Sequence, residues 1–179
     1  MTNELIIAGF GGQGVLLMGQ LLTYAGMVED KNVSWLPSYG PEMRGGTTNC
    51  NVIVSDEPVG SPVVTEADCV IVFNRPSLDK FEKFLKPGGK LFINSSLIDK
   101  KPARNDIEVY YVPVNEAAMK LGNVKVINLI MLGAFVAATG LVKKDSVMKA
   151  VAKTFGEHKA NLIAINEQAF DEGARLIAG

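Results

Sequence analysis

ELIIAGFGGQGVLLMGQLL, residues 4–22, is the stretch of sequence that determines the fold class of this chain. The apolar run 4–8 is typical of a buried strand, and residues 15–28 have the length and apolar content of a helix. Between them, residues 9–14 match the pattern G-x-G-x-x-G, in which glycines let the backbone turn tightly and approach a ligand closely. A strand, a glycine-rich turn and a helix in this order indicate an α/β protein.

Strand-like and helix-like segments alternate along the rest of the chain. Further strands are predicted at residues 32–36, 47–54, 68–73, 90–94 and 107–112. A helix is predicted to begin at Pro76 and to end at residues 86–89, KPGG, and from Val114 onward the periodicity is helical. The pattern predicts a Rossmann-like, mostly parallel sheet with helices on both faces and a helical C-terminal portion, in a single domain over residues 1–179.

Composition and charge exclude several classes of function. The chain has 18 basic and 19 acidic residues, without the positive excess of proteins that bind nucleic acid or anionic membranes. The first residues lack the pattern of a signal peptide, which predicts a cytoplasmic protein. The apolar segment 126–138 is shorter than the roughly 20 residues that cross a bilayer. We expect it to be a helix that is buried in the chain or covered by another subunit.

The residues that usually carry out catalysis or bind metal are scarce. Cys50 and Cys69 are far apart and are predicted to be reduced and buried, and two thiols are too few for a four-thiolate iron–sulfur cluster. The only histidine, His158, is predicted to lie in a C-terminal helix and on the surface. No catalytic residue and no metal site are therefore predicted, and the chain is not expected to perform redox chemistry alone.

The glycine-rich turn has three interpretations. The helix that follows it would point free N–H groups and its positive dipole end at an anion, with the N–H groups of Gly12 to Gly14 as donors. A nicotinamide dinucleotide site would also need an acidic residue at the end of the second strand, which ends Trp35-Leu36-Pro37. Alternatively, the glycines serve only close packing of strand and helix. The candidate binding residues are Gly9, Gly11, Gly12, Gln13, Gly14 and Arg44.

Arg44 belongs to a second loop, residues 38–46, which is too rich in proline and glycine for regular structure. We expect this loop to lie near the glycine-rich turn, because both would follow neighbouring parallel strands and ligands bind at that carboxyl edge. The Arg44 guanidinium is suited to a phosphate or carboxylate. The alternative is an ion pair with Glu42 or with a carboxylate of a partner chain. Asn74 and residues 94–96 also follow strands and are predicted to form turns and helix caps.

Four segments in this order resemble the gamma subunit or domain of 2-oxoacid:ferredoxin oxidoreductases: IIAGFGGQGVLLMGQLL (6–22), PSYGPEMRGGTTNCNVIVS (37–55), EADCVIVFN (66–74) and KPGGKLFINSS (86–96). The resemblance implies oxidative decarboxylation of a 2-oxoacid with coenzyme A to an acyl-CoA, carbon dioxide and reduced ferredoxin. The second segment looks most like the 2-oxoglutarate branch of the family and next like the 2-oxoisovalerate branch.

The resemblance also implies partners and cofactors. In this family thiamine diphosphate and its magnesium lie on alpha- and beta-type subunits, and [4Fe–4S] clusters lie on the beta-type and a ferredoxin-like delta-type chain. This chain would support the complex and help to bind coenzyme A, and we expect a homodimer when it is isolated. The competing hypotheses are a stand-alone nucleotide- or coenzyme A-binding module and a purely structural interaction protein.

Overall fold

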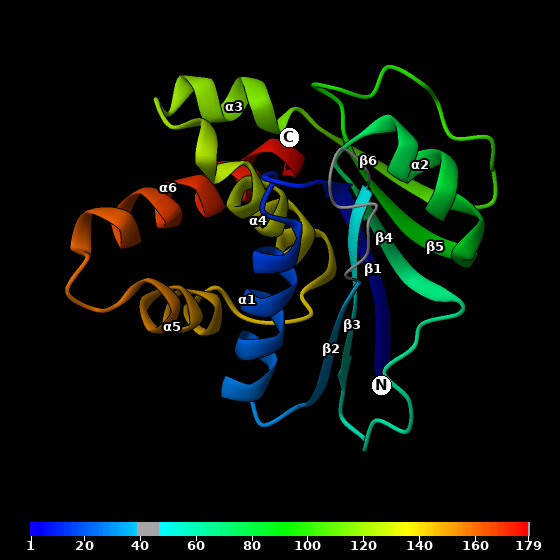
Figure 1. Cartoon of the computed structure of the whole chain (residues 1–179), viewed down its shortest axis with the longest axis horizontal. Helices are drawn as coiled ribbons and strands as arrows, with labels where there is room; N and C mark the ends of the chain where they lie inside the picture. Colours follow the sequence, from blue (N-terminus) through cyan, green and yellow to red (C-terminus); the bar gives the residue numbers. More distant parts are fainter. Residues whose placement is uncertain (39–46, 179) are drawn as a thin grey trace.

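The computed structural model describes residues 1–38 and 47–178 of the chain (Figure 1). The strands are β1 (Thr2–Phe10), β2 (Asn32–Ser38), β3 (Thr47–Ser55), β4 (Ala67–Val72), β5 (Leu85–Asn94) and β6 (Glu108–Val112). The α-helices are α1 (Val15–Val28), α2 (Arg75–Phe81), α3 (Val114–Lys120), α4 (Ile127–Thr139), α5 (Lys144–Phe155) and α6 (Ala160–Ile177). Within the described residues, the strands lie in the first two thirds, with α1 after β1 and α2 after β4, and helices follow.

The strands form one sheet in the order β2-β3-β1-β4-β5-β6. β1, β4, β5 and β6 run parallel, whereas β3 is antiparallel to both β1 and β2. The prediction of a mostly parallel sheet is therefore confirmed. The expectation that the first two strands are neighbours is wrong, because β3 turns back and inserts between them. β2 nevertheless runs in the same direction as β1, so both strands end at the same edge of the sheet.

Helices cover both faces of the sheet, as predicted (Figure 1). Successive side chains of a strand point to opposite faces. Leu5 and Ile7 of β1 pack in the larger core with α1 and α4, whereas Ile6 and Ala8 pack in the smaller core beneath α2. Burial on both faces explains why β1 is an uninterrupted apolar run.

Helix α4 is the apolar segment that could have been buried in the chain or covered by another subunit. Its residues from Ile127 to Val136 are buried within this chain. A Cβ atom at Gly133 would overlap the backbone carbonyl of Phe170, and one at Gly173 would overlap that of Ile130, so α4 and α6 cross in direct backbone contact. Among the helices that the structure describes, none has the length and apolar character to span a membrane.

The helix predicted from Pro76 to the KPGG segment is shorter than expected. It ends at Phe81, a 3-10 turn follows at Glu82–Phe84, and β5 already begins at Leu85. Ala67 pairs with Leu85 and Cys69 with Lys90, so residues 86–89 bulge out of the ladder. A proline and two glycines disfavour a helix but are compatible with such a bulge.

The prediction that His158 lies in a helix is wrong, because it lies in the turn between α5 and α6. Gly156 ends α5 with a φ of 92°, which an alanine would rarely adopt. The imidazole is exposed, so the prediction of a surface residue is confirmed.

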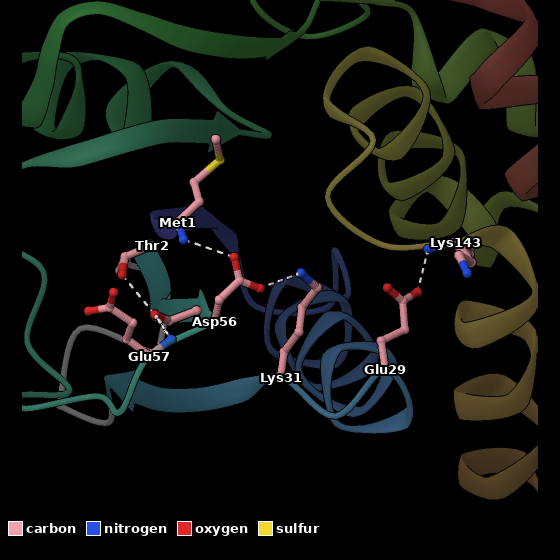
Figure 2. A network of polar contacts seen from close by, with 8 residues as sticks. Met1, Thr2, Glu29, Lys31, Asp56, Glu57 and Lys143 are labelled. Carbon is pink, nitrogen blue, oxygen red and sulfur yellow. Dashed lines mark hydrogen bonds and ion pairs between the residues drawn. The ribbon is translucent and has the colours of Figure 1, made fainter.

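Ion pairs hold the elements together at the amino edge of the sheet (Figure 2). The Asp56 carboxylate contacts the amino group of Met1 at 2.8 Å and Lys31 Nζ at 3.1 Å, and these contacts lower the pKa of Asp56. Glu29, at the end of α1, accepts a hydrogen bond from the Lys143 N–H at 2.6 Å. These contacts join the starts of β1 and α5 to the ends of β3 and α1.

Candidate functional site

The glycine-rich turn lies at the carboxyl edge, between β1 and α1. The helix after β1 packs on one face of the sheet, and the helix after the adjacent β4 packs on the other (Figure 1). Between β1 and β4, therefore, the connecting helices switch from one face of the sheet to the other. In α/β proteins such a point opens a crevice in which ligands bind.

Gln13 stabilises the turn through hydrogen bonds to Phe10. Its N–H donates to the Phe10 carbonyl at 3.2 Å, and its Oε1 accepts a hydrogen bond from the Phe10 N–H at 2.6 Å. Its Nε2 lies 3.4 Å from the carbonyl oxygen of Phe73, at the end of β4. The Gln13 N–H, one of the donors predicted to face a ligand, is thus used within the turn itself.

Close packing accounts for two of the glycines. A Cβ atom at Gly9 would lie 2.9 Å from Cβ of Phe73 and from Cγ2 of Val15. Gly14 has a φ of 76°, and its Cβ would lie 2.6 Å from Nδ2 of Asn128, which donates to the Gly14 carbonyl at 3.3 Å. The packing interpretation therefore holds for Gly9 and Gly14.

Gly12 has a different environment. Its φ is 91°, and a Cβ atom built on it would meet no atom within 4 Å. Gly11 and Gly12 are exposed, and both line a cavity of about 280 Å³ beside the start of α1. At this position the backbone is open to a ligand.

The cavity combines donors from a helix and from a neighbouring strand. Its wall includes Val15, Leu16 and Leu17, whose N–H groups belong to the first turn of α1, where a helix leaves its donors free. Gly14 precedes them without a side-chain cap. Phe10 of β1 and Thr48 of β3 complete the wall. Thr48 is only 3% exposed, and its buried Oγ1 has no hydrogen-bond partner in the part of the chain that the structure describes. Helix donors and a buried hydroxyl at one cavity suit a phosphate group.

Three further charged residues bear on the candidate site: Arg44 and Glu42, which were predicted to lie near it, and Glu29. Arg44 and Glu42 lie outside the described residues, although β3 begins beside the turn, with Thr47 opposite Phe10. Glu29 ends α1, whose 14 residues span about 21 Å, so its carboxylate cannot contact a ribose at the turn. The dinucleotide interpretation has no carboxylate near the site among the described residues.

Asn74 and Asn94, at the ends of β4 and β5, are turn and cap residues as predicted. Asn74 Oδ1 accepts a hydrogen bond from the Ser77 N–H at 2.9 Å and caps α2. Asn94 Nδ2 donates to the Phe73 carbonyl at 3.2 Å and to Asn115 Oδ1 at 2.8 Å. These amide hydrogen bonds hold the segments that follow β4 and β5 in place at the carboxyl edge.

The two cysteines are buried in different strands, Cys50 in β3 and Cys69 in β4, with β1 between them. Burial raises the pKa of each thiol to about 12, so both are protonated at neutral pH. Within residues 1–38 and 47–178, no group of three His, Cys, Asp or Glu side chains is placed to hold a metal ion.

Sequence reasoning missed Thr48 and Asn128. Thr48 is one of several small polar residues in an alternating strand, and Asn128 lies 114 residues from its partner Gly14. Only their place in the folded chain distinguishes them.

Comparison with known proteins identifies the family. Residues 4–176 match the model of the pyruvate ferredoxin/flavodoxin oxidoreductase family. The chain is 33% identical over 173 residues to the 2-oxoglutarate synthase subunit KorC of Methanocaldococcus jannaschii, covering 93% of this chain and 92% of that protein. It is 41% identical over 170 residues to the ketoisovalerate oxidoreductase subunit VorA of Methanothermobacter marburgensis, covering 94% of this chain but only 35% of VorA. The chain thus spans about a third of the length of VorA.

A solved structure gives the same assignment. The gamma subunit of a keto/oxoacid ferredoxin oxidoreductase from Geobacter sulfurreducens superposes with a TM-score of 0.84. It is 32% identical in sequence, and the match covers 98% of both chains. The chain therefore belongs to the pyruvate ferredoxin/flavodoxin oxidoreductase family, and it is similar over its length to a gamma subunit of that family.

Proposed function

We propose that this chain is the gamma subunit of a cytoplasmic complex that oxidatively decarboxylates a 2-oxoacid with coenzyme A, forming an acyl-CoA and reducing ferredoxin. The observation that carries the proposal is the match over nearly the whole length to gamma-type subunits of this family. The glycine-rich turn supports it, because an open backbone and a helix N-terminus at the sheet's carboxyl edge suit a phosphate-bearing cofactor.

The carbon and electron chemistry belongs to other subunits of the proposed complex. Thiamine diphosphate with Mg²⁺ would supply the electron sink for decarboxylation, and [4Fe–4S] clusters would carry the electrons to ferredoxin. Each cluster needs four thiolates, whereas this chain has two cysteines, both buried and protonated. We therefore assign these groups to alpha-, beta- and ferredoxin-like delta-type partners.

The role left for this chain is to bind a phosphate of coenzyme A. The residues that fit are Gly12, Gly14 and Val15 to Leu17 through their backbone N–H groups, with Thr48 through its hydroxyl. Gln13 acts indirectly, because it holds the turn in shape through Phe10. Fixed donors of this kind bind an anion without first having to be ordered.

Arg44 provides a test of this role. If its guanidinium binds the coenzyme A phosphate, Arg44→Ala should raise the KM for coenzyme A by roughly 10- to 150-fold, which corresponds to the loss of a charged hydrogen bond. Decarboxylation of the 2-oxoacid should stay nearly intact. If Arg44 instead braces a subunit interface through Glu42 or a partner carboxylate, the variant should assemble poorly and the remaining complex should saturate normally. Assembly and coenzyme A saturation, measured on one preparation, separate the two roles.

We propose 2-oxoglutarate as the substrate, and KorC, of which the chain covers 92%, supports this choice. Ketoisovalerate is the second candidate, because VorA has the higher identity of 41%. The purified complex should reduce ferredoxin with a higher kcat/KM on 2-oxoglutarate than on ketoisovalerate or pyruvate. The reverse order would assign the complex to another branch of the family.

The subunit role is tested by purification. The tagged chain, co-expressed with its candidate partner subunits, should be recovered in a complex that oxidises a 2-oxoacid only when coenzyme A is present. The isolated chain should be inactive and should form a homodimer in light scattering, since symmetric pairing through a self-complementary surface is the commonest oligomer. Turnover by the isolated chain would overturn the subunit proposal and favour an independent enzyme.

A further inference from the structure

Asn128 joins the starts of two helices. It is the second residue of α4 and is only 2% exposed. Its Oδ1 accepts a hydrogen bond from the Leu129 N–H at 3.0 Å, and its Nδ2 donates to the Gly14 carbonyl at 3.3 Å. The Nδ2 group can approach this carbonyl because residue 14 has no Cβ atom, which would lie 2.6 Å from it. Gly14 directly precedes α1, so one buried amide links the first turn of α4 to the start of α1.

Capping of α4 accounts for only half of the Asn128 side chain. The first N–H groups of a helix have no partner within that helix, and Val126, which precedes α4, has an apolar side chain that cannot cap it. The Asn128 oxygen satisfies one of these groups, and an oxygen of aspartate or serine could do the same. Asparagine differs from both because the same short, planar group also carries an N–H donor. That donor faces the Gly14 carbonyl.

The Gly14 carbonyl belongs to the same peptide unit as the Val15 N–H. Because this unit is planar and trans, its carbonyl and its N–H point in opposite directions. The carbonyl is held by Asn128 and by the Met18 N–H, which donates to it at 2.9 Å. These two bonds therefore also fix the direction of the Val15 N–H, which is one of the free donors of the first turn of α1. Val15 lines the cavity beside the glycine-rich turn.

Helix α4 is a rigid support for this contact. It is buried from Ile127 to Val136, and it packs backbone to backbone on α6 at Gly133 and at Gly173. It also packs against α1 in the layer of helices on one face of the sheet (Figure 1). A side chain that such an element supports keeps its position better than one on a loop.

We propose that Asn128 is a positioning residue of the candidate site, which aims the Val15 N–H at a phosphate group of the ligand. This inference rests on the proposed function, in which coenzyme A supplies the phosphate. Asn128 acts through the Gly14–Val15 peptide unit, since it is not among the described residues that line the cavity. Its role complements that of Gln13, which holds the preceding part of the turn through Phe10.

Asn128→Leu tests the role, because leucine is similar in size and makes neither hydrogen bond. The Gly14 carbonyl would keep its bond to the Met18 N–H but lose the one that comes from α4. Asn166→Leu is the matched control. Asn166 is a 5% exposed asparagine of α6 whose Nδ2 donates to the Leu162 carbonyl at 2.7 Å, and α6 is not among the described elements that line the cavity. Both variants lose a buried amide-to-carbonyl bond, so both should lower the Tm.

Kinetics of the assembled complex give the first measurement. Asn128→Leu should raise the KM for coenzyme A by roughly 5- to 10-fold, the effect of one lost hydrogen bond. The kcat and the KM for the 2-oxoacid should stay within about twofold of wild type, since the lost interaction serves binding of coenzyme A alone. Asn166→Leu should leave all three constants within about twofold.

Amide NMR of the isolated, nitrogen-15-labelled chain gives a second measurement, which identifies the donor. Coenzyme A should shift the signals of Gly12 and Val15 in the wild-type chain. In Asn128→Leu the shift of Val15 should be lost, whereas the shift of Gly12, which lies before the peptide unit held by Asn128, should remain. A general loss of stability would affect both signals alike. If circular dichroism shows that Asn128→Leu is unfolded, Asn128→Ala, which removes the same bonds without adding methyl groups, replaces it in both measurements.

The outcomes separate this inference from the proposed function. If neither wild-type signal responds to coenzyme A, the coenzyme A role in the proposed function is wrong and the inference fails with it. If both respond and the Asn128 variant keeps the Val15 shift and the wild-type KM, the positioning role is overturned while the proposed function stands. The positioning role is also overturned if Asn166→Leu raises the KM for coenzyme A equally, because the effect would then come from the stability of the helical layer.

Discussion

The two edges at which the strands begin and end are held together by different forces. At the amino edge, Lys86 Nζ lies 3.0 Å from a carboxylate oxygen of Glu4 and 3.0 Å from one of Asp68. Lys31 Nζ forms an ion pair with the Asp56 carboxylate. At the carboxyl edge, amide and backbone groups make the contacts around the glycine-rich turn, and Gln13 is the central one. The charges of the amino edge satisfy one another. At the carboxyl edge the helix N-terminus has free donors and the buried Thr48 hydroxyl has no partner among the described residues, which is why we place the ligand there.

The largest effect on stability should come from adding a side chain at Gly14, where the turn packs against Asn128. Gly14→Ala places a Cβ in a left-handed conformation and against the Asn128 side chain, and should lower the free energy of unfolding by about 2–3 kcal/mol. Gly12→Ala is the control, because its φ is equally left-handed but the added methyl meets no atom within 4 Å. Gly12→Ala should lower the free energy of unfolding by only about 1 kcal/mol. Urea unfolding of both variants measures the difference, and equal losses would show that the Asn128 contact is unimportant.

A smaller effect should appear in coenzyme A binding. Thr48→Val keeps the shape of the side chain and removes a hydroxyl that has no partner among the described residues, so stability should be unchanged or slightly higher. The KM for coenzyme A of the assembled complex should rise by roughly 5- to 10-fold, the effect of one lost hydrogen bond. Lys86→Met, at the amino edge, should leave that KM unchanged. If both variants raised the KM equally, the difference between the edges would have no functional meaning.

The smallest effect should come from the amino edge and should depend on pH. Contacts with the Met1 amino group and with Lys31 hold the pKa of Asp56 below its usual value of 3.8. A carboxyl whose folded pKa is depressed stabilises the fold above its unfolded pKa, and this contribution is lost as the pH falls through the folded pKa. Asp56→Asn should therefore slightly lower the Tm at neutral pH. The difference from wild type should shrink below a pH of about 4; a difference that persists in acid would point to packing instead of charge.

The sequence was sufficient to predict the glycine-rich turn and its place at the carboxyl edge, because the motif and both flanking elements are local. It did not predict that β3 inserts between β1 and β2. Alternating side chains identify a strand, but pairing depends on contacts such as Phe10 with Thr47, which are distant in sequence. The KPGG segment was assigned as the end of a helix for a related reason. Proline and glycine interrupt helices, and in this fold they form a bulge within β5.

The sequence predicted which backbone segment forms the candidate site, but it did not predict the roles of the side chains there. The residues of the turn were identified, but Gln13 was assigned to the ligand although its hydrogen bonds close the turn. Thr48 carries no local signal of a binding role, because threonine is common in strands. Its significance comes from burial without a partner beside the start of α1, which is a property of the folded chain.

The most direct test of the central claim is coenzyme A binding by the complex with and without this chain. Equilibrium titration of both preparations should give an affinity at least about 10-fold weaker when the chain is omitted, since the fixed donors of its helix N-terminus would be missing. The thiamine diphosphate content should not change, because that cofactor is assigned to other subunits. Equal coenzyme A affinity in the two preparations would contradict the claim that the carboxyl edge of this chain is a cofactor-binding edge.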